Sequence, residues 1–540
     1  MINLKLVLLK LIYNFVFFGK CYSQMNPFKL VKFDISPTSA AHLPDGNILI
    51  WVGATKGSEQ QDETALITNY QIINTDGVDI GSGFAQTMNL GEMFCTGTSN
   101  LPDGNILING GSNMKSTILF NYNTSTFTNI TSMGRPRGYN ANCVTTDNRI
   151  FTLGGEWGPQ GDSSTDYYGE IIDLNTNEWV ELKNVSGLVA GKVDKPHDDQ
   201  SNQNHMWIFP FKDIYNNHRV FKAGPSPNMH IINLKDGTMK YAGKRGSDKM
   251  GIQGTAVQYE PGKILTLSGT MYQDNQKDNV YMLASKLAFI IDMNPMVSNM
   301  NAIPIVSNPI NRIFNRVTHN AVIIPGGNVI VIGGQTNLKK WNDKYGVLQP
   351  ELYDPTKNMF TLLNYTMKYS RNYHSVALLL KDGRVLIAGG GSGIGCETYS
   401  KSCNTHFDGE IFTPPYLIGV SNSNRPIIES VKNNVSSCIA TSLDFTVKNC
   451  NILVITIASN TCGIQGCSFD LIRLSSVTHS INNDQLRIPL TINSITNNKF
   501  KVSIDNKFLP FVVSGNYYLF AINNSTGVPS IGKVINIKRN

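Results

Sequence analysis

Charge is sparse in this sequence and is not concentrated anywhere. Charged residues make up 16% of the 540 residues, the net charge is +7, and no run of five or more Lys or Arg occurs. Proteins that bind nucleic acids or membrane surfaces concentrate positive charge, so we expect neither partner. After residue 23 there is no long helical periodicity and no apolar stretch long enough to span a membrane. These absences favour an all-β globular protein.

Cysteine is also scarce, with nine residues in the whole chain. Cys396 and Cys403 are close enough in sequence to close a small loop through a disulfide. Cys95 and Cys143 remain open to two interpretations, a disulfide between them or buried thiols. Two more disulfides are expected in the C-terminal region, in pairings that spacing does not decide, among Cys438, Cys450, Cys462 and Cys467.

The N-terminus has the pattern of a secretory signal. An apolar segment, residues 6–18, lies between Lys5 and the small residues Cys21 and Ser23. Lys10 interrupts it, which leaves it short for a bilayer span of roughly 20 residues. We therefore expect residues 1–23 to be a signal peptide and the mature protein to be extracellular. Seven glycosylation sequons agree with secretion: Asn123, Asn129, Asn184, Asn364, Asn434, Asn523 and Asn524.

A repeat occupies residues 24–424. Each copy has an apolar strand, a tight turn, a second apolar strand and then glycine. A weaker copy lies between Trp207 and Gly224, which brings the number to seven. Paired strands repeating every roughly 40 to 60 residues predict a seven-bladed kelch-type β-propeller. The six clear turns are Asp45-Gly46, Asp103-Gly104, Asp147-Asn148, Pro261-Gly262, Gly326-Gly327 and Asp382-Gly383.

The repeat stops before residue 425. Short strand patterns at spacings typical of a sandwich fill residues 425–540. We predict a C-terminal immunoglobulin-like β-sandwich there.

Three reactive side chains share one position in the repeat. Cys95 lies nine residues before Gly104, and Tyr139 and His374 lie nine residues before the corresponding turn residues of their own copies. If this position is at the inner end of the innermost strand, all three side chains converge on the propeller axis, where such folds bind ligands. Tyr373, beside His374, reaches the same point only if that point lies beyond the strand end. Imidazole and phenolate together suit copper.

With these residues in view, the chain resembles the copper radical oxidases, the family of galactose oxidase and glyoxal oxidase, and galactose oxidase most closely. The matching segments keep the family's order over almost the whole mature chain. They are residues 93–97, 137–139, 154–157, 371–375, 406–408 with 411–414, and 478–480 with 484–485 and 487–490.

The resemblance implies a copper site. Tyr139, His374 and His479 would be ligands in one plane, and Tyr373 would be the axial ligand and the base. His479 lies in the C-terminal region, so that region would have to send a hairpin down the propeller channel. Cys95 would be joined to Tyr139 by a thioether, and the joined ring would hold a radical.

Further implied residues surround this site. Trp157 would stack over the joined ring, and Tyr272, Gln273 and Trp341 would line the substrate pocket. The arginine that clamps sugar hydroxyls in galactose-binding members is absent, because Gln200 and Ser201 precede the segment that begins at Asn204. Galactose itself is therefore in doubt as the substrate.

The implied activity is oxidation of a primary alcohol, a galactose-like sugar or another, to an aldehyde, with O2 reduced to hydrogen peroxide. An alcohol loses two electrons and copper stores one, which explains why a second, protein-derived oxidant is needed. Three alternatives stay open: aldehyde oxidation to a carboxylic acid, as in glyoxal oxidases; a copper protein without the thioether; and a non-catalytic kelch scaffold that binds protein or glycan. We expect a monomer.

Overall fold

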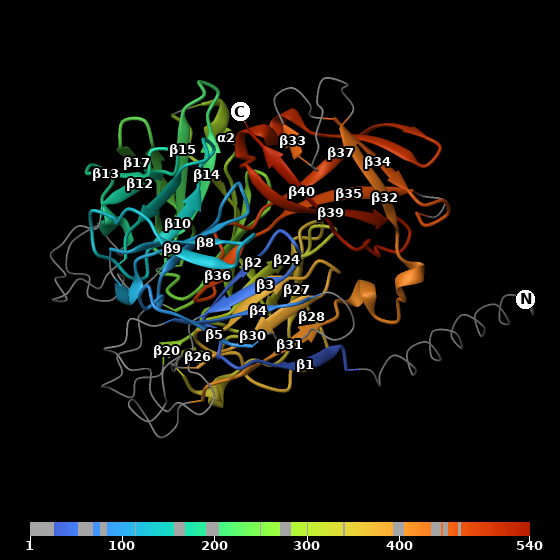
Figure 1. Cartoon of the computed structure of the whole chain (residues 1–540), viewed down its shortest axis with the longest axis horizontal. Coiled ribbons are helices and arrows are strands. Elements are labelled where there is room, and N and C mark those ends of the chain that lie inside the picture. The colour runs from blue at the N-terminus through green and yellow to red at the C-terminus, as the bar shows by residue number, and fades with distance from the viewer. Residues whose placement is uncertain are drawn as a thin grey trace, which may run out of the picture.

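The structure is a computed structural model. It describes residues 26–51, 68–75, 84–113, 115–155, 168–190, 205–248, 250–270, 282–299, 301–338, 341–391, 404–433, 444–446, 452–462 and 466–539. Seven antiparallel sheets surround a central axis and an eight-stranded sheet follows them (Figure 1). The predicted all-β class, a seven-bladed propeller followed by a C-terminal sandwich, is confirmed. Among these residues no helix is long and apolar enough to cross a membrane.

The first four blades each have four strands of the propeller repeat, from the axis outward. The predicted weak copy is blade 4. Blade 1 is β2 (Ser39–His42), β3 (Ile48–Trp51), β4 (Thr68–Ile73) and β5 (Gln86–Met88); blade 2 is β6 (Gly97–Asn100), β7 (Ile106–Asn109), β8 (Thr117–Asn121) and β9 (Thr126–Asn129); blade 3 is β10 (Ala141–Val144), β11 (Ile150–Leu153), β12 (Gly169–Asp173) and β13 (Glu178–Leu182); blade 4 is β14 (Trp207–Lys212), β15 (His218–Gly224), β16 (Asn228–Asn233) and β17 (Thr238–Lys244).

The other three blades follow the same plan. Blade 5 is β18 (Thr255–Glu260), β19 (Lys263–Leu267), β21 (Leu287–Asp292), β22 (Ile305–Val306) and β23 (Ile310–Asn311); blade 6 is β24 (Asn320–Ile323), β25 (Val329–Ile332), β27 (Glu351–Asp354) and β28 (Met359–Leu362); blade 7 is β29 (Val376–Leu379), β30 (Val385–Ala388), β31 (Asp408–Phe412) and β1 (Phe28–Lys32). Smaller elements are β20 (Met282–Leu283) paired with β26 (Asn337–Leu338), the helix α2 (Asn294–Ser298), and 3-10 turns at Gly111–Asn113, Gly187–Ala190, Asp343–Tyr345, Pro415–Leu417, Asn422–Asn424 and Asn506–Phe511.

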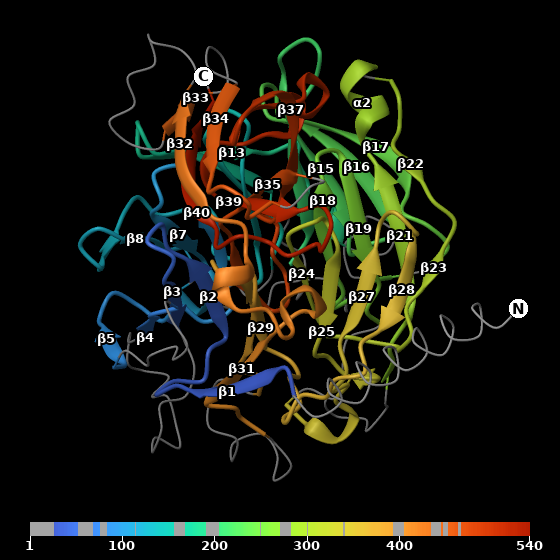
Figure 2. The same ribbon diagram turned by 90° about the vertical axis from the view of Figure 1, so that its right-hand side faces the viewer.

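The propeller is closed by its own first strand. Strand β1 pairs antiparallel with β31, so that Phe28 lies opposite Phe412 and Lys32 opposite Asp408 (Figure 2). Because the beginning and the end of the repeat share one sheet, blade 7 holds the ring shut through main-chain hydrogen bonds.

The expected tight turns join the two inner strands of the blades. Gly46 and Gly104 both have φ of 94°, a conformation that favours glycine. Asp45 supports the first turn, since its Oδ1 accepts a hydrogen bond from the Asn47 amide at 2.9 Å. These turns set the register of the inner strands and therefore the level at which each strand reaches the axis.

Buried ion pairs hold the segments that lead into the inner strands. Arg137 pairs with Glu170, Arg316 with Glu351 at 2.7 Å, and Arg371 with Glu410 at 3.2 Å; the six side chains are almost completely buried. Each carboxylate also accepts a main-chain hydrogen bond from the chain that enters its blade, at 2.7 to 2.8 Å. Satisfied networks of this kind fix one conformation of the backbone.

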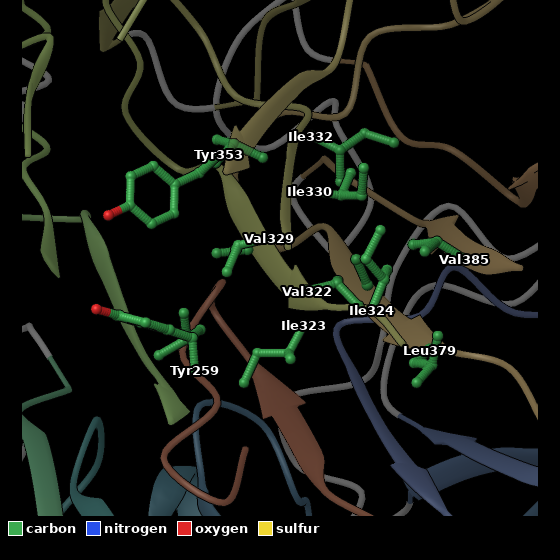
Figure 3. Close-up of a cluster of buried hydrophobic side chains, with 14 of the residues drawn as sticks. Tyr259, Val322, Ile323, Ile324, Val329, Ile330, Ile332, Tyr353, Leu379 and Val385 are labelled. Carbon is green, nitrogen blue, oxygen red and sulfur yellow. The ribbon is translucent and has the colours of Figure 1, made fainter. Parts of the chain in front are cut away.

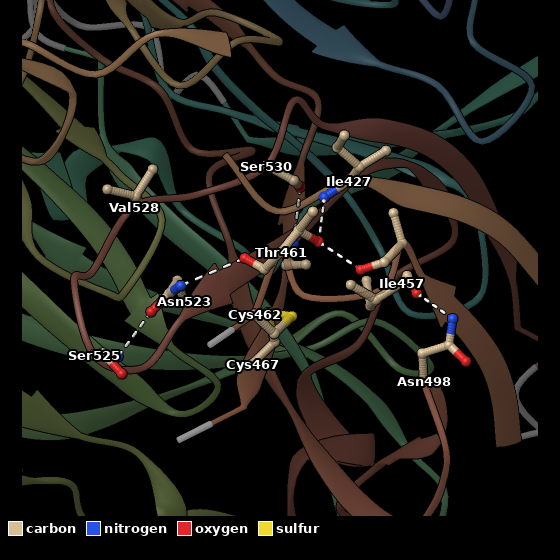
Figure 4. The surroundings of a disulfide bond; sticks show 12 residues. Ile427, Ile457, Thr461, Cys462, Cys467, Asn498, Asn523, Ser525, Val528 and Ser530 are labelled. Atoms are coloured by element: carbon tan, nitrogen blue, oxygen red, sulfur yellow. Dashed lines mark hydrogen bonds between the residues drawn. A yellow bond between two sulfur atoms is a disulfide. The ribbon is translucent and has the colours of Figure 1, made fainter. Parts of the chain in front are cut away.

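The C-terminal sheet folds around its own apolar core. Cys462 and Cys467 form a disulfide beside that core (Figure 4), which resolves one of the pairings left open above. Cys396, Cys403, Cys438 and Cys450 lie outside the described residues. In sheet order the strands are β32 (Ile428–Asn433), β34 (Ile452–Ile457), β38 (Lys499–Ile504), β37 (Arg487–Thr496), β35 (Cys467–Arg473), β39 (Gly515–Asn523), β40 (Lys533–Lys538) and β33 (Asp444–Thr446).

The two parts of the chain share one hydrophobic cluster. Its centre lies in blades 5 to 7, where Tyr259, Val329 and Tyr353 pack (Figure 3), and it continues into Ile472 and Tyr518 of the C-terminal sheet. Burying apolar surface between them stabilises their relative position. The C-terminal sheet therefore has a fixed position relative to the propeller, and so does any segment that extends from this sheet into the propeller channel.

Candidate metal centre

Seven equivalent positions ring the propeller axis. In every blade the position lies two residues before the innermost strand. The inner strands of neighbouring blades contact one another around the axis, except that the strand Ser476–Thr478 of the C-terminal region lies between those of blades 1 and 2. The seven residues are Pro37, Cys95, Tyr139, His205, Gln253, Thr318 and His374. Three of these are the side chains that the repeat phase singled out.

Five of the seven residues have a backbone conformation that is rare for their type. Positive φ angles of 51° to 72° occur at Cys95, Tyr139, Gln253, Thr318 and His374. Non-glycine residues in this region carry about 1–3 kcal/mol of strain each, and such residues gather at functional sites. A residue in the left-handed conformation breaks the alternation of side chains along an extended chain, so its side chain leaves the direction that a strand residue would have there.

His374 is oriented by a main-chain carbonyl. Its Nδ1 lies 2.8 Å from the Gly391 oxygen, while the Gly391 amide donates to the Tyr373 carbonyl at 2.9 Å. A carbonyl only accepts, so Nδ1 carries the hydrogen and Nε2 keeps the lone pair. This is the tautomer of a histidine that binds metal through Nε2.

His479 arrives from the C-terminal region at the tip of a hairpin. Strand β36 (Ser476–Thr478) pairs with β2 of blade 1, and it lies among the blades rather than with the other C-terminal strands (Figure 1). Thr478 and Ile481 exchange main-chain hydrogen bonds of 3.1 and 2.8 Å, and His479 and Ser480 between them have φ of 51° and 66°. Two positive φ angles make a type I′ turn, which usually needs Asn-Gly.

The hairpin is fixed to several blades by buried hydrogen bonds. Thr255 of blade 5 donates to the Ser480 carbonyl at 2.7 Å. The Gln485 side chain bonds the main chain of blade 6 on both sides, at 3.0 Å from the Ile323 amide and 2.8 Å to the Ala321 carbonyl. His479 itself has Nδ1 2.7 Å from the Thr478 hydroxyl. The position of His479 is thus set by contacts of the hairpin with blades 1, 5 and 6.

Two phenol groups meet at the same place. The hydroxyl oxygens of Tyr139 and Tyr373 lie 3.4 Å apart, which is long for a hydrogen bond between hydroxyls. Burial, followed by the neighbouring Cys95 and Tyr373, raises the pKa of Tyr139 well above its usual value. Burial also raises the pKa of Tyr373. Both phenols are therefore protonated in the protein alone, and a bound cation acts in the opposite direction.

These groups form a compact set of donor atoms. The ligand atoms of Cys95, His374 and His479 all lie within 4.8 Å of one another, and all three residues are buried. Ligand atoms held about 2.0–2.3 Å from one ion lie at such separations. Cys95 also forms a hydrogen bond to the Tyr139 hydroxyl. Two imidazoles with two phenol oxygens and a thiol at the edge suit copper better than a hard cation.

Comparison with known proteins shows which family has a similar sequence. The chain is 31% identical over 525 residues to galactose oxidase of Gibberella zeae, covering 93% of this chain and 69% of that protein. The chain belongs to the galactose oxidase family. An aldehyde oxidase of Arabidopsis thaliana is 26% identical over 66% of this chain and 58% of its own length. The predicted resemblance is confirmed, and family membership makes the protein an oxidoreductase.

The other comparisons agree with this family. Residues 299–416 match the family described as glyoxal oxidase N-terminus, residues 425–537 the galactose oxidase-like Early set domain, and residues 137–186 the Kelch motif. A solved structure of a fungal alcohol oxidase of the AA5 family, in complex with copper, has a TM-score of 0.78 and 28% identity, and the match covers 94% of this chain and 98% of that one.

The structure says little about the other four residues that were predicted to surround the site. Trp157, Tyr272 and Gln273 lie outside the described residues. Trp341 lies two residues before Asp343, whose carboxylate accepts a hydrogen bond at 2.7 Å from the side chain of Asn372, the residue before Tyr373. The pocket role of Trp341 stays a prediction.

Sequence reasoning did not name four of the seven axial positions, and two of these, His205 and Gln253, lie beside Tyr373 and His479. Gln253 lies nine residues before Gly262, the spacing that picked out the other three, and this signal was available in the sequence. His205 was missed because it lies eleven residues before Asn216, the positive-φ turn residue of blade 4, whereas the corresponding spacing in the other blades is nine residues. When positions are counted from the start of the innermost strand instead of from the turn, His205 is equivalent to Cys95, Tyr139 and His374. Cys143 is a buried thiol and not a disulfide partner of Cys95.

Replacing Gly391 with alanine should displace His374. Gly391 has φ of 119°, and a Cβ there would lie 2.3 Å from the Asn404 oxygen, so the backbone that accepts the His374 hydrogen bond has to move. We expect a loss of about 1–3 kcal/mol of stability and reduced copper binding per folded molecule. Thermal unfolding and metal analysis measure both.

Gly326→Ala is the matched control. Gly326 has φ of 92°, but a Cβ added there would meet nothing within 4 Å, so this variant carries the strain without the collision. It should lose stability and keep copper. Equal copper content in the two variants would show that Gly391 does not orient His374.

Proposed function

We propose that this protein is a copper radical oxidase that oxidises a primary alcohol to an aldehyde and reduces O2 to hydrogen peroxide. One observation carries the proposal: Cys95, Tyr139, Tyr373, His374 and His479 come from three blades and the axial hairpin and gather their reactive atoms in one buried cluster. A kelch scaffold that only binds a partner has no reason to keep this set together.

The residues present fit a copper ion. His374 and His479 would hold it through Nε2, and Tyr139 and Tyr373 through their phenol oxygens. The fit rests on the His374 tautomer fixed by Gly391 and on the spacing of the donors. When bound, copper acidifies a coordinated hydroxyl and accepts one of the two electrons that an alcohol gives up.

Cys95 and Tyr139 would supply the second oxidising equivalent. The Cys95 thiol forms a hydrogen bond with the Tyr139 hydroxyl, so its sulfur lies close to the phenol oxygen. A thioether to the Tyr139 ring would make the phenol easier to oxidise. Forming it removes one hydrogen from the thiol and one from the ring, with O2 as the oxidant. Trp157 is proposed to shield the joined ring.

Tyr373 would be the base. It takes the hydroxyl proton of the substrate, and the oxidised Tyr139 takes a hydrogen atom from the adjoining carbon. With the one remaining electron passed to the bound copper, the alcohol would become an aldehyde. O2 then accepts the two electrons and two protons and leaves as hydrogen peroxide. Burial keeps Tyr139 from bulk water, since its side chain is 9% exposed.

The substrate class has a second candidate. The glyoxal oxidase match over residues 299–416, and the likeness to a plant aldehyde oxidase, favour oxidation of a hydrated aldehyde to a carboxylic acid on the same site. Trp341, with Tyr272 and Gln273, is proposed to line the pocket in either case, and a carbohydrate alcohol is among the candidates.

The protein is further proposed to be secreted as a monomer. Residues 1–23 would be the signal, 24–424 the propeller, and 425–540 the domain that contributes His479. The disulfide Cys462–Cys467 supports an oxidising compartment. Five sequon asparagines lie on the surface of the described chain, as glycosylation needs: Asn123, Asn129, Asn184, Asn364 and Asn524.

A peroxide-coupled screen tests the function. Copper-loaded protein should release hydrogen peroxide with at least one of galactose, glycerol, simple primary alcohols or glyoxal-type aldehydes, and removing copper with a chelator should stop it. Apo protein reloaded with zinc is the control, because zinc has no redox chemistry. No peroxide from any of these substrates, in protein with the full copper content, would contradict the proposal.

A further inference from the structure

A small cavity adjoins the candidate metal centre on the side of blades 4 and 5. It leaves about 10 Å³ for the centre of a water-sized sphere, enough for one such group. Tyr373 and His479 lie in its wall, so a group held there is next to the proposed copper position. The wall consists of His205, Trp207, Pro225, Gln253, Gly254, Tyr373, His479 and Ile481.

His205 presents a hydrogen-bond acceptor to this cavity. Its side chain is buried, and its Nδ1 lies 2.8 Å from the Asn140 carbonyl, so Nδ1 carries the hydrogen. Nε2 therefore keeps its lone pair, and within the described residues it has no hydrogen-bond partner. Leaving a buried acceptor without a donor costs about 1–3 kcal/mol. A hydroxyl or a water molecule held in the cavity can supply this donor.

The surroundings hold the imidazole in place. Its ring lies 4.9 Å from the His479 ring and 5.8 Å from the Tyr139 ring, centre to centre. Asn140, which anchors Nδ1, is the residue after Tyr139 and is itself held by Asn109 at 3.1 Å. His205 is therefore placed by the same backbone that places Tyr139.

We propose that His205 Nε2 accepts a hydrogen bond from a second hydroxyl of the substrate, on or next to the carbon that is oxidised. The proton of the first hydroxyl goes to Tyr373 in the proposed function, on which this inference rests, so His205 needs another donor. The cavity has room for one hydroxyl. A vicinal diol or a hydrated aldehyde supplies that group, and a monohydric alcohol does not.

Ligand binding to the copper(II) protein with Tyr139 unoxidised, which does not turn over, tests this. Ethylene glycol, methylglyoxal (largely hydrated in water) and ethanol are titrated while the visible and EPR spectra of the copper are followed. In His205→Phe, we expect affinity for glycol, methylglyoxal or both to fall roughly three- to tenfold, the worth of one hydrogen bond. Ethanol affinity should change by less than about twofold.

Two further variants separate hydrogen bonding from packing. His205→Gln restores an acceptor oxygen and should recover part of the lost affinity. His230→Gln removes a buried imidazole from β16 of the same blade, outside the cavity wall, and should leave all three affinities unchanged. A loss confined to glycol indicates a vicinal diol, and a loss confined to methylglyoxal indicates a geminal one; both support the proposal.

Several results would overturn the proposal. These are unchanged affinities in His205→Phe, an equal fall for ethanol and the diols, or loss of copper in both His205 variants, which would make His205 a support for the metal. A copper protein that forms no peroxide yet shows the diol effect would refute the oxidase function alone.

Discussion

Replacing Cys95 with glycine is expected to leave copper binding intact and to lower oxidase activity by at least roughly a hundredfold, about 2.7 kcal/mol of barrier. Cys95 has φ of 57°, so glycine fits the backbone and relieves strain. The proposed ligands His374, His479 and the two tyrosines are untouched. What disappears is the sulfur that is proposed to make the Tyr139 phenol easier to oxidise.

Intact-mass analysis gives a measurement that does not depend on activity. After copper loading in air, wild-type protein should lose the mass of two hydrogen atoms and its Cys95 should no longer alkylate. Cys143→Ala is the control, because Cys143 is the other buried thiol of the described propeller and lies outside the donor cluster. It should keep the mass loss and the activity. A Cys95 that alkylates fully in active wild-type protein would refute the radical mechanism.

Asp484→Asn should both destabilise the protein and weaken its hold on copper. Asp484 accepts hydrogen bonds from Arg473 at 2.6 Å, from the Asn100 amide at 2.9 Å and from Ser476 at 3.1 Å. The pair is buried, so removing the charge leaves Arg473 without compensation, at a cost of about 3–5 kcal/mol. These bonds also tie the base of the hairpin to blade 2, and copper affinity should fall roughly 10–100-fold.

Glu351→Gln is the matched control for this prediction. Glu351 forms an equally buried pair with Arg316 in blade 6, and within the described chain the hydrogen bonds to its carboxylate come from residues 313, 314 and 316 and not from the hairpin. Its loss should lower the free energy of unfolding in urea by a similar amount and leave copper affinity unchanged. Chelator competition measures the affinity in both variants. Equal affinities would mean that the Asp484 contacts do not position His479.

The blades could be predicted because their cause is local. A turn such as Asp45-Gly46 needs positive φ and a short side chain that bonds the backbone two residues on, and both needs are visible in the residues themselves. The phase of Cys95, Tyr139 and His374 follows from the same turns. Blade 4 shows the limit, because two extra residues between His205 and the turn at Asn216 moved His205 out of the count made from the turn.

The hairpin tip could not be predicted from local preference. The residue types of His479-Ser480 do not favour a type I′ turn. The pair adopts this turn because Thr255, Gln485 and the pairing with β2 hold the backbone in that conformation. Tertiary contacts outweigh local propensity wherever they are many and buried. The expectation that this region enters the channel came from the family resemblance and not from the residues of the turn.

The sequence by itself determined the repeat, the order of the reactive residues and the kind of chemistry that phenol, imidazole and thiol can perform, since these depend on residue type and spacing. Only the tertiary structure decided that the donors meet within 4.8 Å, that His374 presents Nε2, and that His205 joins the site through a cavity. The reason is physical: convergence depends on how seven blades close around an axis and on a hairpin from another sheet, and neither is encoded within one stretch of chain.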